Sequence, residues 1–187
     1  MSHGIDTPAA LAIDPDTPEF LQPLARALQR VNQAMVVLGM FALLIASVVL
    51  TYSVVSRYVL KASTDWQDEA AVFCLVGATF LCGAFVQALR GHVGIEAVAG
   101  LLPSGLNRLR LLFVDLLSAA FCAFFSWKSW TLFHEALVEG QVTSSSWAPP
   151  LWIQYSRMAA GMSLLTLQIL MQLTARFNAL TKPRVAA

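Results

Sequence analysis

Charged residues are scarce in this sequence, and their scarcity excludes most classes of soluble protein. Only 12% of the 187 residues are charged and 57% are hydrophobic, whereas a soluble domain is about 25% charged. The apolar residues are gathered into blocks of about 18 or more residues with almost no charge, which is the pattern of transmembrane helices. The formal net charge of +1 supplies no basic surface for nucleic acid. The composition therefore predicts an integral membrane protein without a nucleic-acid partner.

Residues that bind metals, haem or phosphate are also few. The three histidines lie in the N-terminal segment, in a loop and near the end of an apolar block, as His3, His92 and His134. A haem-binding bundle needs histidines that face one another within the membrane. No Cys/His cluster has the spacing of a zinc site, and no glycine-rich loop suits a phosphate group. We therefore predict no enzyme activity, no cofactor and no metal.

The three cysteines, Cys74, Cys82 and Cys122, all fall inside apolar blocks. Cys74 and Cys82 are ~12 Å apart along one helix, which is too far for a disulfide. We predict that all three are small apolar packing residues.

Four apolar blocks are long enough to cross a membrane. They cover residues 31–56, 70–89, 109–133 and 151–173, and about 20 helical residues cross ~30 Å of hydrocarbon. The sequence therefore predicts an all-α integral membrane protein with four transmembrane helices and short interfacial helical segments. The membrane domain is expected at 26–177, between a disordered cytoplasmic tail at 1–25 and a second cytoplasmic tail at 178–187.

Lysine and arginine are distributed unevenly between the two sides of the four blocks. Most of the 12 fall at one set of block ends, as Arg26, Arg30, Arg90, Arg108, Arg110, Arg176, Lys182 and Arg184. The loops at the other ends contain only Arg57 and Lys61. Because cytoplasmic loops carry the excess of Lys and Arg, both termini are predicted to be cytoplasmic. The first and third loops then lie outside, in the periplasm if the membrane is a bacterial inner membrane.

Three charged residues lie within the apolar blocks, where charge is costly and marks candidate functional positions. They are Asp115, Lys128 and Arg157. Lys128 and Arg157 lie close enough to the outer helix ends to extend toward the interface. Asp115 lies deeper and needs a basic partner, for which the candidates are Arg90, Arg110 or a group on another chain. A role in holding helices together is favoured over an ion path, because an ion-coupled site usually combines several polar groups at mid-depth.

Small residues recur every four positions in the second apolar block. Such residues let helices approach closely where lipid supplies no hydrophobic driving force. The pattern predicts a packing surface, either within the bundle or against another subunit. The stripe and the glycines beside it are Ala70, Cys74, Gly77, Ala78, Cys82 and Gly83.

The segment STDWQDE, residues 63–69, places three carboxylates and a tryptophan at the predicted outer surface. Thr64 and Gln67 match a capping box, and the helix dipole favours acids in the first turns. Tryptophan and tyrosine also gather near the outer ends, either as an interfacial belt or as a surface that contacts another protein. The candidate residues for docking of a binding protein, or for another outer interface, are Trp66, Asp68, Glu69, Trp147 and Trp152.

Two stretches together resemble the small membrane subunit of tripartite ATP-independent periplasmic (TRAP) transporters. The first runs from SRYVLKASTDWQDE to GLLP, over residues 56–103, and the second is PPLWIQYSRMAAG, at 149–161. Two positions in the first stretch depart from the family pattern. Asp68 replaces the first Glu of the motif, and Glu96 stands where the family usually has Asp. In the fourth helix Ala159 replaces a Pro, and Arg157 places a charge where the family is apolar. Matching positions are Arg57, Tyr58, Ser63, Trp66, Glu69, Gly77, Gly83, Arg90, Gly91, His92, Leu102, Pro103, Pro150, Trp152, Tyr155 and Gly161.

This resemblance implies a non-catalytic subunit that braces a larger, multi-span transport subunit. A periplasmic binding protein would deliver an organic acid to the outer face, and the sodium gradient would drive import. Membrane lipid at the subunit interface is a further expected contact. Two other functions remain open on the residues alone: a self-contained ion-coupled exporter or exchanger that uses Asp115, and a membrane anchor for a redox complex.

Overall fold

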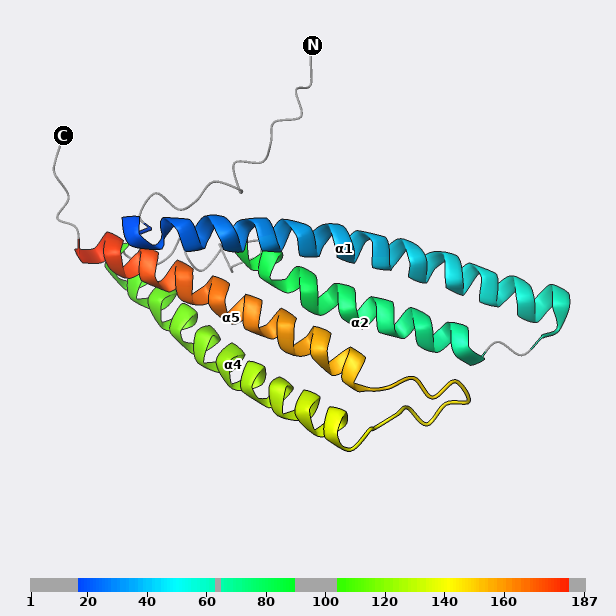
Figure 1. The fold of residues 1–187 in the computed structure, drawn as a ribbon. Coiled ribbons are helices and arrows are strands. Elements are labelled where there is room, and N and C mark those ends of the chain that lie inside the picture. Colours follow the sequence, from blue (N-terminus) through cyan, green and yellow to red (C-terminus); the bar gives the residue numbers. More distant parts are fainter. Residues whose placement is uncertain (1–16, 63–64, 90–103, 182–187) are drawn as a thin grey trace, which may run out of the picture.

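The computed structural model of the protein describes residues 17–62, 65–89 and 104–181. Within these ranges four long helices follow one another along the chain (Figure 1). Each is long and apolar enough to cross a membrane, which confirms the prediction of a four-helix membrane protein. The helices are α1 (Gln22–Val55), α2 (Asp65–Ala88), α4 (Ser104–Val138) and α5 (Trp152–Thr181), and two short segments flank α1, η2 (Glu19–Leu21) and η3 (Ser56–Leu60). The tail predicted at 1–25 falls mostly outside the described residues, and α1 already begins at Gln22.

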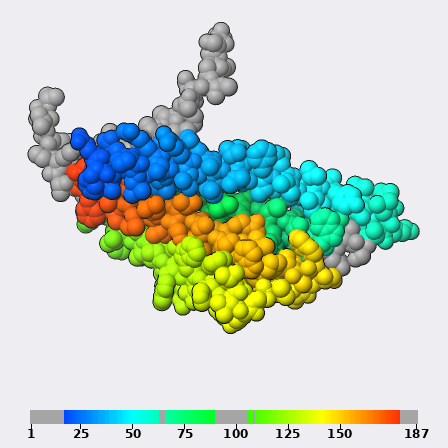
Figure 2. Space-filling view, in the orientation of Figure 1, coloured from blue at the N-terminus to red at the C-terminus, as the bar shows by residue number. Residues whose placement is uncertain are grey.

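The four helices pack as a row in the order α1, α2, α5, α4. Figure 2 shows α1 along one long edge of the molecule and α4 along the other. The helices lie closest together at the end where α1 begins and α5 ends, and α1 and α4 diverge toward the opposite end (Figure 1). The two inner helices, α2 and α5, therefore have a neighbour on each side, whereas α1 and α4 are each left with a largely uncovered face.

The packing surface of α1 is a single narrow line of small and polar residues. Asn32, Gly39, Ala46 and Ser53 are buried, and they recur every seventh residue. A seven-residue repeat keeps one seam of a helix facing its neighbour. On the rest of α1 many large apolar residues are exposed, among them Phe41, Leu44, Val48 and Val54. The helix thus contacts the row through one seam and presents apolar side chains over the remainder of its circumference.

Glycines set the closest helix–helix approaches. A Cβ atom built on Gly161 of α5 would overlap the backbone carbonyl oxygen of Phe80 on α2, and one built on Gly39 of α1 would overlap Sγ of Cys82. The small-residue stripe predicted on α2 therefore serves both neighbours of that helix. Ala78 and Cys82 lie against Gly39, whereas Gly77 lies beside Arg157 of α5, and Gly83 faces open space. All three cysteines are free thiols.

We expect Gly161→Ala to lower the stability of the folded chain. The added methyl group meets backbone atoms of Phe80, which cannot rotate away, and overpacking of this kind costs about 1–3 kcal/mol. The measurement is the thermal unfolding of the purified chain in detergent. Gly83→Ala is the matched control, since its methyl group meets nothing within 4 Å and alanine favours a helix. Equal unfolding temperatures for the two variants would show that the α2–α5 approach does not depend on Gly161.

Candidate functional site

The start of α2 meets the loop between α4 and α5 at the end of the row opposite to the start of α1 and the end of α5 (Figure 1). The rings of Trp66 and Trp147 pack edge to face, with centroids 6.3 Å apart and an interplanar angle of 66°. Glu69 accepts a hydrogen bond from the Ser145 hydroxyl group. Both tryptophans are about half exposed. Two segments that are distant in the sequence thus form one aromatic and acidic surface.

The loop that carries Ser145 and Trp147 is held by its own hydrogen bonds. Thr143 N donates to Pro149 O at 3.1 Å, and Leu151 N donates to Gln141 O at 3.0 Å. Ser145 Oγ accepts a hydrogen bond from Ala148 N at 3.1 Å, and Ala148 adopts the left-handed conformation with φ of 46°. The Ser145 hydroxyl group is therefore fixed by its own loop before it donates to Glu69.

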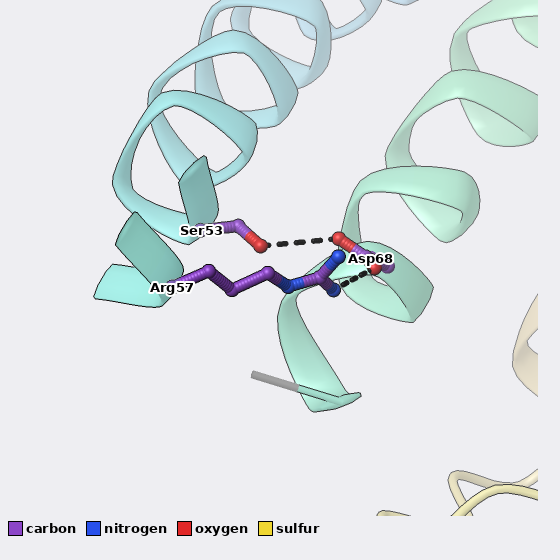
Figure 3. A network of polar contacts seen from close by, with 3 residues as sticks. All are labelled: Ser53, Arg57 and Asp68. Atoms are coloured by element: carbon purple, nitrogen blue, oxygen red, sulfur yellow. Dashed lines mark hydrogen bonds and ion pairs between the residues drawn. The ribbon is translucent and has the colours of Figure 1, made fainter. Parts of the chain in front are cut away.

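Asp68 points to a different neighbour from Glu69. It forms an ion pair with Arg57 of η3, and the Ser53 hydroxyl group of α1 donates to it at 3.2 Å (Figure 3). Arg57 lies in the widened π-helical turn of η3, which ends at Lys61 in the left-handed conformation. The two acids predicted to share one docking surface therefore have separate partners, Asp68 on the α1 side of α2 and Glu69 on the α4–α5 loop.

The other residues of the predicted docking surface and capping box make few contacts or lie outside the described residues. Trp152 is the first residue of α5 and is exposed, but within the described residues its ring contacts neither Trp66 nor Trp147. Thr64 of the predicted capping box lies outside the described residues. Gln67 is buried, and no hydrogen-bond partner for its Oε1 is found in the described part of the chain.

A row of polar side chains along α5 binds each of the other three helices, and sequence reasoning missed most of it. Gln168 Oε1 accepts a hydrogen bond from Asn32 Nδ2 of α1 at 3.1 Å. Gln172 Oε1 accepts one from Gln87 Nε2 of α2 at 2.8 Å. Arg176 forms an ion pair with Asp115 of α4 at 2.9 Å. We call Gln168, Gln172 and Arg176 the α5 polar row. The sequence did contain a signal for this row. Its three residues are spaced four apart at the end of an apolar block, and polar residues so spaced lie on one face of a helix.

The partner expected for Asp115 was wrong. Its carboxylate pairs with Arg176, a residue predicted to lie on the cytoplasmic side. Arg110, one expected candidate, instead donates from Nε to Asn107 Oδ1 at 3.2 Å, and Arg90 lies outside the described residues. The error arose because α4 and α5 pack side by side, so the Arg176 side chain reaches an acid of the neighbouring helix. Such pairing across helices is the usual fate of intramembrane acids.

Two of the aromatic and basic residues predicted to lie near the outer face contact other side chains of the bundle. Trp130 Nε1 donates to Ser163 Oγ of α5 at 3.0 Å, and Ser126 Oγ lies 2.9 Å from the same oxygen. The Lys128 ammonium group lies over the Trp127 ring, 5.1 Å from its centroid, which is a cation–π contact. Trp130 therefore joins α4 to α5 through its indole N–H, a role distinct from that of an interfacial belt residue.

These observations define a multi-pass helical membrane protein whose intramembrane polar groups mostly join its own helices. No group of three or more His, Cys, Asp or Glu side chains that could hold a metal is present among the residues that the structure describes. The family model of the tripartite ATP-independent periplasmic transporters, DctQ component, matches residues 46–179. The chain therefore belongs to this family and is a small subunit of a TRAP transporter, a transporter component and not an enzyme. Comparison with curated proteins and with solved structures gave no match.

The Asp115–Arg176 ion pair gives a test of the end of the row where α1 begins and α5 ends. Asp115→Asn leaves the largely buried Arg176 guanidinium without its counter-charge, and breaking a buried pair costs about 3–5 kcal/mol. We expect a clear loss of stability in denaturation of the chain in detergent. The double variant Asp115→Asn, Arg176→Gln should recover most of that loss, because no unpaired charge remains. A double variant as unstable as the single one would contradict this account, and Lys128→Gln is the control for removing an exposed charge.

Proposed function

We propose that this small subunit is a non-catalytic brace for a large transport subunit of the bacterial inner membrane. In this proposal a periplasmic binding protein delivers an organic acid, and the sodium gradient drives its import through the large subunit. Membership of the TRAP family supports the association with a large subunit and a binding protein. The substrate class, the sodium coupling and the bracing role go beyond what family membership supports, and we propose them here.

The observation that carries the bracing role is the uncovered surface of α1. The continuous helical stretch Glu19–Leu60 has 42 residues, whereas about 20 residues cross the hydrocarbon of a bilayer. Lipid can cover only part of this length. Beyond Val55 the exposed fractions of Tyr58, Val59 and Leu60 are 82%, 72% and 64%, and such an apolar surface outside the hydrocarbon indicates a contact with another protein. We infer that α1 is the edge that binds the large subunit.

The α5 polar row supports a brace over a self-contained exporter. The acid that the exporter hypothesis requires, Asp115, is paired with Arg176. The hydrogen bonds of Gln168 and Gln172 also run between helices. Polar groups that are engaged in helix–helix contacts hold the row rigid, and a rigid row is what a static support for a moving transport subunit requires.

Co-purification and uptake test the proposal directly. The chain is expected to co-purify with a large multi-span membrane protein, and deletion of the chain is expected to abolish uptake that depends on a binding protein. The measurement is uptake of labelled organic acids by cells or vesicles with and without the chain. Uptake at the full rate by the large subunit alone would exclude a bracing role.

The outer surface gives a sharper prediction, because Asp68 and Glu69 have different partners. Glu69→Lys changes the charge of the exposed aromatic and acidic surface, so we expect a several-fold rise in the binding-protein concentration needed for half-maximal uptake. Asp68→Lys places a cation against Arg57, so we expect less folded complex and little change in that concentration for the complex that remains. Uptake titrations with purified binding protein, normalised to the amount of complex, measure both effects. If Asp68→Lys raised the half-maximal concentration and Glu69→Lys only reduced the amount of complex, then Asp68, and not Glu69, would belong to the docking surface.

A further inference from the structure

Arg157 is a cation in the contact between α2 and α5 for which the described residues offer no carboxylate. Its guanidinium Cζ lies 5.5 Å from the centroid of the Phe73 ring on α2. Its Nε donates to Ile153 O, one turn earlier on α5, at 3.2 Å. No other hydrogen bond and no ion pair of Arg157 occurs within the described ranges. The two Nη groups, which carry four of the five guanidinium N–H donors, are therefore available to a ligand.

The α2 helix provides the space that this guanidinium occupies. Gly77 lies beside it, so that a Cβ atom on Gly77 would stand 3.1 Å from Arg157 Cδ and 3.2 Å from Nη1. The Phe73 ring lies under the cation, and Arg157 as a whole is only partly buried. Glycine on one side and an aromatic face beneath set the position of the cation, and the residue remains partly exposed.

Arg157 lies within about two turns of the start of α5, the helix end predicted to lie at the outer membrane surface. It is the sixth residue of α5, which begins at Trp152, so its Cα lies ~8 Å along the axis from the start of the helix. Phe73 follows Ala70, the residue at which the apolar part of α2 begins, by about one helical turn. An arginine at this depth extends its side chain toward the headgroup layer. Phosphate groups are the anions of that layer, and the planar guanidinium binds them through two parallel hydrogen bonds.

We propose that Arg157, Phe73 and Gly77 form a binding site for the phosphate group of an outer-leaflet phospholipid. The ligand is an anionic phospholipid such as phosphatidylglycerol, because it carries no ammonium group of its own to compete for the phosphate. The site lies between the two inner helices of the row, away from the exposed face of α1 that we assign to the large subunit. Its occupant supplies a counter-charge that the described residues do not offer to Arg157, and seals the predicted outer part of the α2–α5 contact.

The test is native mass spectrometry of the full-length chain, with any membrane partner that co-purifies, titrated with phosphatidylglycerol in detergent. Arg157→Met is expected to weaken the most tightly bound phosphatidylglycerol by about tenfold or more. Lys128→Met, which removes another outer cation, should leave that affinity unchanged. Diacylglycerol, which lacks the phosphate, should not bind at this site in the unaltered chain.

A second pair of variants keeps every charge and so separates binding from folding. Gly77→Ala pushes a methyl group against Arg157 Cδ and Nη1, and we expect it to weaken phosphatidylglycerol binding several-fold. Gly83→Ala adds the same methyl group to the same helix in open space and should have no effect. Circular dichroism of each variant checks that the helices are intact.

Several results would overturn the proposal. Phosphatidylglycerol binding that is equal in the unaltered chain, Arg157→Met and Gly77→Ala would remove the site. Inorganic phosphate that binds at Arg157 as tightly as the phospholipid would show a site for a free anion in place of a lipid. If the unaltered chain lost the lipid when a large subunit is bound, Arg157 would be inferred to pair with a carboxylate of that protein and not with a lipid.

Discussion

A polar group inside a bilayer must find its hydrogen-bond partner within protein, because the hydrocarbon offers none. The α5 polar row provides such partners between α5 and each of the other three helices. Gln168 binds α1, Gln172 binds α2 and Arg176 binds α4. Since lipid supplies no hydrophobic drive that would select one apolar helix face over another, these contacts select the neighbours. The convergence of the four helices at one end of the row (Figure 1) follows from where the α5 polar row lies.

Close packing at glycine residues adds to the polar contacts between the helices. Gly161 brings the backbones of α2 and α5 together, and Gly39 does the same for α1 and α2. Many large apolar side chains of α1 and α4 stay exposed along the two edges of the row. The subunit thus joins its own helices by polar and close-packed contacts and leaves apolar side chains exposed along its edges.

The candidate site was predicted only in part. The charge distribution and the family resemblance singled out the acids and tryptophans at the predicted outer end, and Trp66 and Trp147 do meet. Their division into two contacts was not predictable, because Asp68 and Glu69 are adjacent in the sequence and only packing shows that they face different helices. The partner of Asp115 was likewise misassigned, since spacing within one helix carries no information about which side chain of another helix lies opposite.

The sequence by itself determined the four helices, their approximate limits and the family, because apolar blocks of membrane length form helices whatever surrounds them and the motifs are local. The tertiary structure alone decided the order of the row, the pairing of Arg176 with Asp115 and the placement of Arg157 over Phe73. These features join residues that are distant in the chain. They depend on which helix faces come together, and that choice is made by the combined packing of small residues and polar partners, which no single segment encodes.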